Sequence, residues 1–284
     1  MKSKFSSLIA IIVLISLGCA SSPDKRSCEA HPKSLNANPE ITIDMAYYGE
    51  TKPTGKSVLI IPPTGGTNYI DRRYAVNLCE AGFDVFILNS WSNQEFETIQ
   101  PDLHQKFYSR SQLAIGEVLK TVPPGFVGIL GTSVGGLHAS IAVQTEARIQ
   151  AAFFIVTGVP LMNVIMESDQ IAMVELRKAR YEKLGYKTDA YLLEVIQKAF
   201  TLEPQQLGNH FKGKNIGMSI ALNDTTIPTS LQLNLKEFFQ PQKVITYDSS
   251  HFWGIAKTWL FNTSDIVDFF ERSAQVKNSD YAKR

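Results

Sequence analysis

Short apolar runs alternate with helix-like segments along most of this chain. Runs typical of buried strands cover residues 57–61, 84–88, 126–130, 151–156, 216–222 and 243–247, and a more polar strand is expected at 41–48. Helical spacing of apolar residues is found at 69–81, 103–120, 133–147 and 263–275. This alternation predicts an α/β fold in which helices cover both faces of a mostly parallel central sheet.

One long segment, residues 160–214, interrupts the alternation. It has a helix-like, mixed-charge sequence without a strand signal, and it stands between the predicted strands 151–156 and 216–222. We therefore expect a helical cap that is inserted into a single α/β domain of residues 41–284.

The first eighteen residues have the pattern of a secretory signal peptide. Lys2 and Lys4 precede an apolar run, 8–17, which is too short to span a bilayer core of about 30 Å as a helix. The small residue Gly18 and then Cys19 follow the run, which resembles the lipobox of bacterial lipoproteins. We expect export and a lipid anchor on Cys19 that holds the protein to a bacterial membrane, facing the periplasm or the outside. The alternative is cleavage after Ala20 and secretion in soluble form.

Residues 19–40 are polar and contain prolines but almost no large apolar side chains, which predicts a tether between the anchor and the domain. The chain has three cysteines, too few for a disulfide scaffold. Export would allow Cys28 and Cys79 to form a disulfide. The alternative is that Cys79 is a buried, reduced residue of the helix 69–81.

Composition and charge exclude several classes of protein. The 284 residues are 44% apolar and 19% charged, as in a folded globular protein and unlike a disordered chain. The formal net charge is +1, and loss of the signal peptide with its two lysines would make it −1. The chain therefore has no basic surplus for binding nucleic acid. Neither H-E-x-x-H nor C-x-x-C occurs in the sequence, so we expect no metal and no cofactor.

The candidate chemistry centres on Ser133. The sequence G-T-S-V-G at 131–135 follows the predicted strand 126–130 and opens the predicted helix 133–147. In a G-x-S-x-G turn between a strand and a helix, the glycines make room for strained backbone angles, and the serine hydroxyl stands at the carboxyl edge of the sheet. The alternative is a glycine-rich loop with an incidental serine.

This turn and its context resemble the α/β-hydrolase superfamily, of the serine esterase and lipase kind, over about residues 41–276. The resemblance implies a nucleophilic serine, then an acid, then a histidine in chain order. It assigns these roles to Ser133, Asp224 and His251, with His251 as general base and Asp224 as its orienting acid.

The positions of the acid and the histidine fit the resemblance. His251 follows the last predicted strand, and Asp224 follows the preceding one, four residues before Pro228, as in the family's D-x-x-V/I-P segment. The alternatives are that His251 is a surface loop residue and that Asp224 only caps a helix. Asp248 is a rival acid.

The resemblance also implies two backbone N–H groups that bind the tetrahedral oxyanion. One belongs to Val134, directly after the nucleophile. The other would come from the loop 62–68, where Thr64, or alternatively Gly65, would donate. Relatives often have His-Gly-x-Gly-Gly in this loop, whereas this chain begins it with two prolines, which have no N–H. The alternative for the loop is a plain turn.

The expected activity is hydrolysis of a carboxylic-ester-type substrate, a small molecule or a lipid, through an acyl-enzyme on Ser133. Phe252 and Trp253 are expected to pack the C-terminal helix, with an acyl pocket as the alternative. Two other functions stay open: an acyltransferase that uses the same three residues, and a non-catalytic binding lipoprotein of the same fold.

Overall fold

The computed structural model describes residues 27–38, 41–50, 52–89, 99–208, 210–211 and 215–281. These residues form an eight-stranded sheet with the strand order β1-β2-β4-β3-β5-β6-β7-β8. The strands are β1 (Ala30–Asn38), β2 (Ile41–Tyr48), β3 (Lys56–Ile61), β4 (Asp84–Leu88), β5 (Phe126–Thr132), β6 (Ala151–Ile155), β7 (Asn215–Ala221) and β8 (Lys243–Tyr247).

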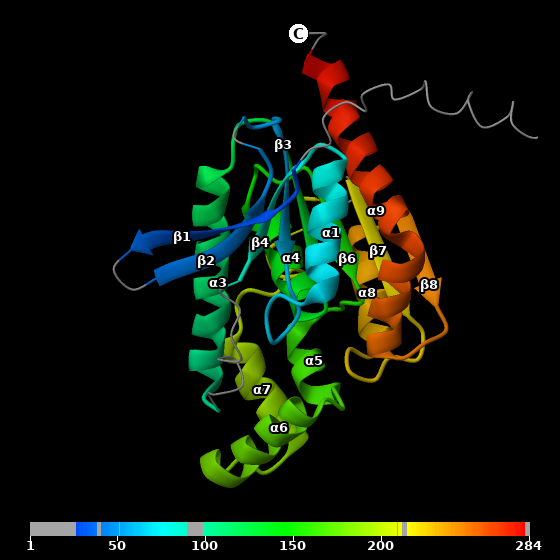
Figure 1. Ribbon diagram of the computed structural model, residues 1–284. Coiled ribbons are helices and arrows are strands. Elements are labelled where there is room, and N and C mark those ends of the chain that lie inside the picture. The colour runs from blue at the N-terminus through cyan, green and yellow to red at the C-terminus, as the bar shows by residue number, and fades with distance from the viewer. Residues whose placement is uncertain are drawn as a thin grey trace, which may run out of the picture.

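Helices cover both faces of this sheet (Figure 1). The six strands from β3 to β8 pair in parallel, and β1 and β2 add an antiparallel edge. The arrangement confirms the predicted α/β fold class. The helices are α1 (Tyr69–Glu80), α3 (Pro101–Thr121), α4 (Val134–Thr145), α5 (Leu161–Glu167), α6 (Ile171–Leu184), α7 (Asp189–Ala199), α8 (Thr229–Phe239) and α9 (His251–Tyr281).

The central strands are buried on both faces because their side chains alternate between two separate apolar clusters. In β3, Val58 and Ile60 join the cluster beneath α1 and α9, whereas Leu59 and Ile61 join the cluster beneath α3, α4 and α8. Burial on both faces explains why these strands read as continuous apolar runs in the sequence.

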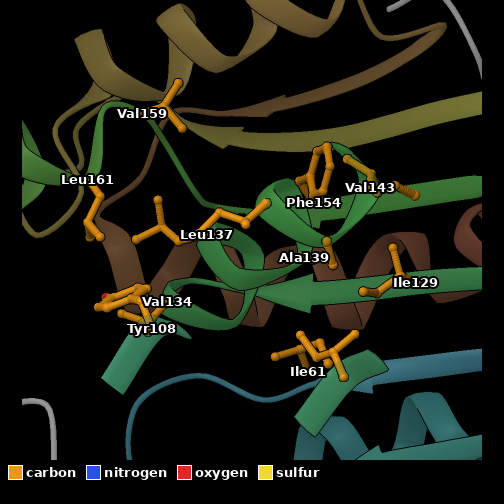
Figure 2. Packing of buried hydrophobic residues seen from close by; sticks show 14 of the residues in the cluster. Ile61, Tyr108, Ile129, Val134, Leu137, Ala139, Val143, Phe154, Val159 and Leu161 are labelled. Carbon is orange, nitrogen blue, oxygen red and sulfur yellow. The ribbon is translucent and has the colours of Figure 1, made fainter. Parts of the chain in front are cut away.

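The segment between β6 and β7 contains α5, α6 and α7, which lie together beyond one end of the sheet (Figure 1). Apolar residues of these helices, such as Leu161 and Leu176, belong to the same cluster as α3 and α4. Figure 2 shows Val134 and Leu137 of α4 close to Leu161 and to Tyr108 of α3. The cap helices therefore share a core with the helix that begins at the serine turn.

A buried carboxylate holds the start of the cap in place. The two oxygens of Glu203 accept the backbone N–H groups of Leu161 and Met162, each at 2.9 Å, at the first turn of α5. Burial raises the pKa of Glu203. The segment after α7 is thereby tied to the segment directly after β6.

The predicted tether of residues 19–40 is wrong over Ala30–Asn38, which form the edge strand β1 and pair with β2. From 30 to 36 its side chains are mostly exposed, which suits a polar composition, and Leu35 packs on the core. An edge strand of this kind is held by backbone hydrogen bonds that leave no apolar pattern. The predicted signal peptide and the predicted lipidation site, Cys19, lie outside the described residues.

A disulfide joins Cys28, just before β1, to Cys79 in the last turn of α1, with their Cα atoms 5.8 Å apart. The sequence left this pairing open. The bond attaches the start of the described chain to the face of the sheet that α1 and α9 cover.

The C-terminal helix is longer than the sequence predicts. Helical spacing indicates 263–275, whereas α9 begins at His251 and passes through one non-helical residue, Asn262. In the preceding stretch, 252–261, seven of ten residues are apolar and are spread around the helix, so no helical period stands out. The expected packing of Phe252 and Trp253 is also wrong, because both side chains are exposed. Within the described chain, no helix combines the length and the apolar character needed to cross a bilayer.

Candidate active site

Ser133 occupies the turn between β5 and α4 with backbone angles that are strained for a residue with a side chain. Its φ is 54° and its ψ is −121°. The serine N–H donates to the carbonyl of Ile155 at 2.8 Å, which ties the turn to the neighbouring strand β6. The hydroxyl therefore stands at the carboxyl edge of the sheet, at the N-terminus of α4.

Two glycines of the G-T-S-V-G sequence are required by close packing. A Cβ atom on Gly131 would lie 2.6 Å from the carbonyl oxygen of Gly135. A Cβ atom on Gly135 would overlap the carbonyl oxygens of Ile61 and Pro62, at the start of the loop after β3. The serine turn and this loop are thus in direct backbone contact, which only glycine permits.

The structure brings the three predicted residues into one hydrogen-bonded chain. His251 Nε2 lies 2.9 Å from Ser133 Oγ, and His251 Nδ1 lies 2.7 Å from Asp224 Oδ2. The three residues follow β5, β7 and β8, whose carboxyl ends meet at one edge of the parallel sheet. His251 is the first residue of α9 and is not in a surface loop.

The carboxylate of Asp224 is fully buried and accepts four hydrogen bonds. Its Oδ1 accepts the backbone N–H groups of Thr226 at 2.8 Å and of Ile227 at 2.9 Å, and its Oδ2 faces both His251 and Gln232. Asp224 therefore organises the turn before α8 and contacts the imidazole as well. The rival acid, Asp248, instead accepts a hydrogen bond from Asn223.

Gln232, which the sequence analysis did not identify, holds this carboxylate from α8. Its Nε2 donates to Asp224 Oδ2 and to the carbonyl of Ile227, both at 2.8 Å, and its Oε1 accepts the N–H of Ala221 at 3.0 Å. The side chain is completely buried. The signal in the sequence that could have identified Gln232 is an amide side chain on the apolar face of the helix that follows Pro228.

Replacement of Gln232 by leucine is expected to lower kcat for an ester about tenfold while KM stays nearly constant. Leucine fills a similar volume but removes one donor to Asp224 and leaves the buried N–H of Ala221 without its acceptor, which costs about 1–3 kcal/mol of stability. Steady-state kinetics and urea unfolding test both effects. As a control, Gln206→Leu changes an exposed glutamine. An unchanged kcat in a folded Gln232→Leu variant would contradict the positioning role.

A close contact of a third glycine, Gly254, sets the place of His251. A Cβ atom on Gly254, in the first turn of α9, would lie 2.6 Å from the Cβ of Ala221 and 3.2 Å from the Cγ2 of Val156. Val156 itself has a φ of 47°, an unusual value for a β-branched residue, directly after β6. The start of α9 therefore packs against the ends of β6 and β7 without a side chain between them.

The two predicted oxyanion donors lie in neighbouring segments. Val134 is the first residue of α4, where backbone N–H groups have no acceptor within the helix. Thr64 lies in a tight turn closed by a 3.1 Å hydrogen bond from the Gly66 N–H to the Pro63 carbonyl. The carbonyl of Pro62 faces Gly135, so the loop borders the serine turn. The donor roles of Val134 and Thr64, with Gly65 as the alternative, stay predictions.

Two other histidines are buried between α3, α4 and the cap, away from the hydrogen-bonded chain of Ser133. His138 stacks on Tyr108 with the ring centroids 4.4 Å apart, and His104 Nδ1 lies 3.0 Å from Nη2 of the buried Arg180. Burial and the neighbouring Arg180 lower the pKa of His104 to about 3, and burial lowers the pKa of His138 well below its ordinary value. Both rings are therefore neutral in the folded protein near neutral pH.

Acid is expected to destabilise the fold through these rings. The folded-state pKa of each histidine lies below the ordinary value of 6.5, so the unfolded chain binds more protons and stability falls as the pH drops below about 6.5. Between pH 7 and pH 5 the free energy of unfolding of the wild type should therefore decrease. His138→Phe keeps an aromatic ring in the stack and should make this decrease smaller by about 2 kcal/mol. Urea unfolding at both pH values measures the unfolding free energy of the wild type and of the variant.

The comparison must be made against the wild type because Asp71 acts in the opposite direction. Burial raises the pKa of this carboxyl to about 7, so its contribution to stability falls as the pH rises from 4 to 7. Both proteins contain Asp71, so its contribution cancels in the difference between their unfolding free energies. If the wild type and His138→Phe lose the same stability on acidification, His138 has no such role.

The described residues contain no group of three or more His, Cys, Asp or Glu side chains that could hold a metal ion. One large cavity, of about 860 Å³, is lined by Lys56, Phe126 and Arg148. Lys56 and Phe126 are the first residues of β3 and β5, so this cavity lies at the opposite end of the sheet from Ser133.

Comparison with known proteins finds similarity in structure alone: no family model and no curated protein sequence matches the chain. An acetyl xylan esterase from Paenibacillus sp. R4 superposes with a TM-score of 0.64 and 15% identity, over 88% of this chain and 89% of that one. An esterase of Pyrococcus furiosus gives a TM-score of 0.58 and 13% identity, over 86% of this chain and 93% of that one.

An acylaminoacyl peptidase of Pyrococcus horikoshii gives a TM-score of 0.62 and 15% identity. The match covers 86% of this chain but only 42% of the peptidase. Because the sequence identities are only 13–15%, these matches are evidence for the fold alone. Together with the parallel sheet, its flanking helices and the serine turn, they show that the chain has the α/β-hydrolase fold.

Proposed function

We propose that the protein is a serine hydrolase that cleaves carboxylic esters through an acyl-enzyme on Ser133. The observation that carries the proposal is the hydrogen-bonded chain from Ser133 through His251 to Asp224, built on a strained strand-to-helix turn. Such a chain pairs a nucleophile with a base and the base with an orienting acid, which is the arrangement that acyl transfer needs.

In the proposed reaction, His251 Nε2 accepts the proton of the Ser133 hydroxyl while Oγ forms a bond to the carbonyl carbon of the ester. The carbonyl oxygen becomes an oxyanion, which the N–H groups of Val134 and Thr64 stabilise. Collapse of this intermediate breaks the bond to the alcohol, which receives the proton from His251. Water then attacks the acyl-enzyme by the same route and releases the acid.

Asp224 supports both steps. Its Oδ2 accepts the hydrogen bond from His251 Nδ1, so that Nε2 is the nitrogen free to take the serine proton. The buried carboxylate also stabilises the imidazolium that forms during each attack. Its remaining hydrogen bonds, from backbone N–H groups and from Gln232, fix its position.

The choice of ester substrates draws support from the structural relatives, two of which are named as esterases. Export and a lipid anchor on Cys19 belong to the same proposal and draw support from the basic start, the apolar run and the small residue before the cysteine. Intact-mass measurement of protein from the membrane fraction tests the anchor. A mature chain that starts after Ala20 without lipid would contradict it.

A fluorophosphonate probe tests the nucleophile directly. The probe should label the folded wild type at Ser133, and Ser133→Ala should abolish the labelling. Ser140→Ala is the matched control, since Ser140 lies in α4 but is buried and donates to the carbonyl of Leu137 at 2.7 Å. Labelling that persists in Ser133→Ala, or a folded wild type that is never labelled, would refute the proposal.

A further inference from the structure

The first half of α9 is apolar on its exposed side as well as on its buried side. Phe252, Trp253, Leu260 and Phe261 expose 65, 57, 56 and 68% of their surface, within ten consecutive positions. A helix at the surface of a protein ordinarily carries polar residues toward solvent, and a contiguous exposed apolar surface marks a site of interaction. We refer to these four residues as the α9 surface.

The α9 surface starts beside the candidate active site, because Phe252 directly follows His251. Tyr69 extends it from a second helix: its side chain is 63% exposed, and its ring meets the edge of Trp259 with the centroids 5.6 Å apart. Tyr69 is the first residue of α1 and follows the loop 62–68. Apolar side chains from two helices therefore adjoin two segments of the site.

We propose that the α9 surface docks the protein onto a lipid bilayer, so that ester hydrolysis takes place at the membrane interface. This inference rests on the proposed hydrolase function and on the proposed anchor. Aromatic and aliphatic side chains on one face of a helix are the residues that enter the headgroup region of a bilayer.

The charges of this segment suit a lipid surface. Residues 251–264 contain one cation, Lys257, and no Asp or Glu. The Lys257 ammonium lies 3.3 Å from the carbonyl of Asp248, and long lysine side chains can place their charge at the headgroups while their stems stay among apolar groups. No acidic group of the segment opposes an anionic bilayer.

The proposed anchor is attached on the same side of the molecule. Cys28 is bonded to Cys79 in α1, and α1 lies beside α9 on one face of the sheet (Figure 1). Along α1, Cys79 lies about 15 Å from Tyr69, the residue that contacts Trp259. A tether from Cys19 to Cys28 spans at most about 30 Å. A lipid on Cys19 can therefore enter the bilayer on which α9 rests.

Vesicle flotation tests the docking without the anchor. Residues 20–284 keep every residue that the structure describes but lack Cys19, and the vesicles contain phosphatidylethanolamine and phosphatidylglycerol. The wild-type chain should float with the vesicles, and Leu260→Ser with Phe261→Ser should lower its partition coefficient at least about tenfold. The matched control is Leu103→Ser with Leu113→Ser, two exposed leucines on α3, which should bind like the wild type.

Trp253 gives a second readout. Its emission should shift to shorter wavelength when vesicles are added, and lipids with brominated chains should quench it, whereas Trp253→Phe should lose most of both signals. Wild-type protein that stays with the buffer, or a Leu260→Ser/Phe261→Ser variant that binds like the wild type, would overturn the proposal. So would a dimer in sedimentation that this variant abolishes, because a second copy would then cover the surface.

The hydrolase proposal is measured separately, with a soluble acetate ester in the absence of vesicles. The variant of Leu260 and Phe261 should hydrolyse this ester at the wild-type rate, because neither residue belongs to the proposed catalytic chain. Hydrolysis of membrane-embedded esters should fall in parallel with vesicle binding. Vesicle binding without hydrolysis of the soluble ester would refute the hydrolase function but not the docking. Hydrolysis of the soluble ester without vesicle binding would refute the docking but not the hydrolase function.

Discussion

Replacement of His251 by alanine is expected to lower kcat for a soluble ester by about 10⁴–10⁶-fold. Without the imidazole, Ser133 Oγ has no base 2.9 Å away to take its proton, and the leaving alcohol has no acid to return it. Fluorophosphonate labelling should stop as well. Steady-state kinetics with a p-nitrophenyl ester measures the loss.

The control is His210→Ala, which removes an exposed histidine from the segment before β7 and should leave kcat unchanged. Asp224→Asn should lower kcat by about 10⁴-fold. It should also destabilise the fold, because an amide nitrogen would then face one of the groups that donate to the carboxylate. A His251→Ala variant that retains a tenth of the wild-type kcat would show that another group acts as the base.

Replacement of Gly135 by alanine is the second change with a large expected effect. The new Cβ would overlap the carbonyl oxygens of Ile61 and Pro62, so either the serine turn or the loop after β3 has to move. Both carry groups of the proposed reaction, and we expect kcat/KM to fall by about 10²–10³-fold or more. Kinetics and fluorophosphonate labelling measure the effect.

Gly116→Ala is the matched control for a glycine in a helix. Its new Cβ would meet only the end of the flexible Glu146 side chain, at 3.0 Å, and alanine favours the helix. This variant should keep full activity. Near-ultraviolet circular dichroism distinguishes a misfolded Gly135→Ala variant from a folded one in which the reacting groups are displaced. We expect the variant to retain the wild-type spectrum. A folded and fully active Gly135→Ala variant would show that the backbone contact is unimportant.

The parts of the site that the sequence could predict are those tied to parallel strands. Buried strands read as apolar runs, and their carboxyl ends meet at one edge, so residues that follow β5, β7 and β8 lie at that edge. Ser133, Asp224 and His251 occupy those positions, and the structure places them within hydrogen-bond distance. The order of serine, acid and histidine that the α/β-hydrolase resemblance implies, together with a position after the last strand, selected His251 from the five histidines.

The parts that could not be predicted depend on contacts without a local pattern. Gln232 is recognisable only once α8 is known to turn its inner face toward Asp224. The edge strand β1 relies on backbone pairing with β2, and its polar side chains hide it. The start of α9 has no helical period, since apolar residues face both the core and solvent. Each of these features depends on contacts between segments that are far apart in the chain.

The position of the cap has a consequence for how this protein can diversify. The cap leaves from β6 and returns into β7, two strands that are direct neighbours in the sheet and are held in register from Ala151 to Ile155. An insertion whose two ends meet at adjacent strands can be lengthened, shortened or exchanged without shifting the strands themselves. Ser133 and His251 follow other strands, and Asp224 lies beyond the end of β7. We expect residues 160–214 to be exchangeable only together with Thr225 and Thr226, because the hydroxyl groups of these two residues, next to Asp224, donate to Asp169 of the cap.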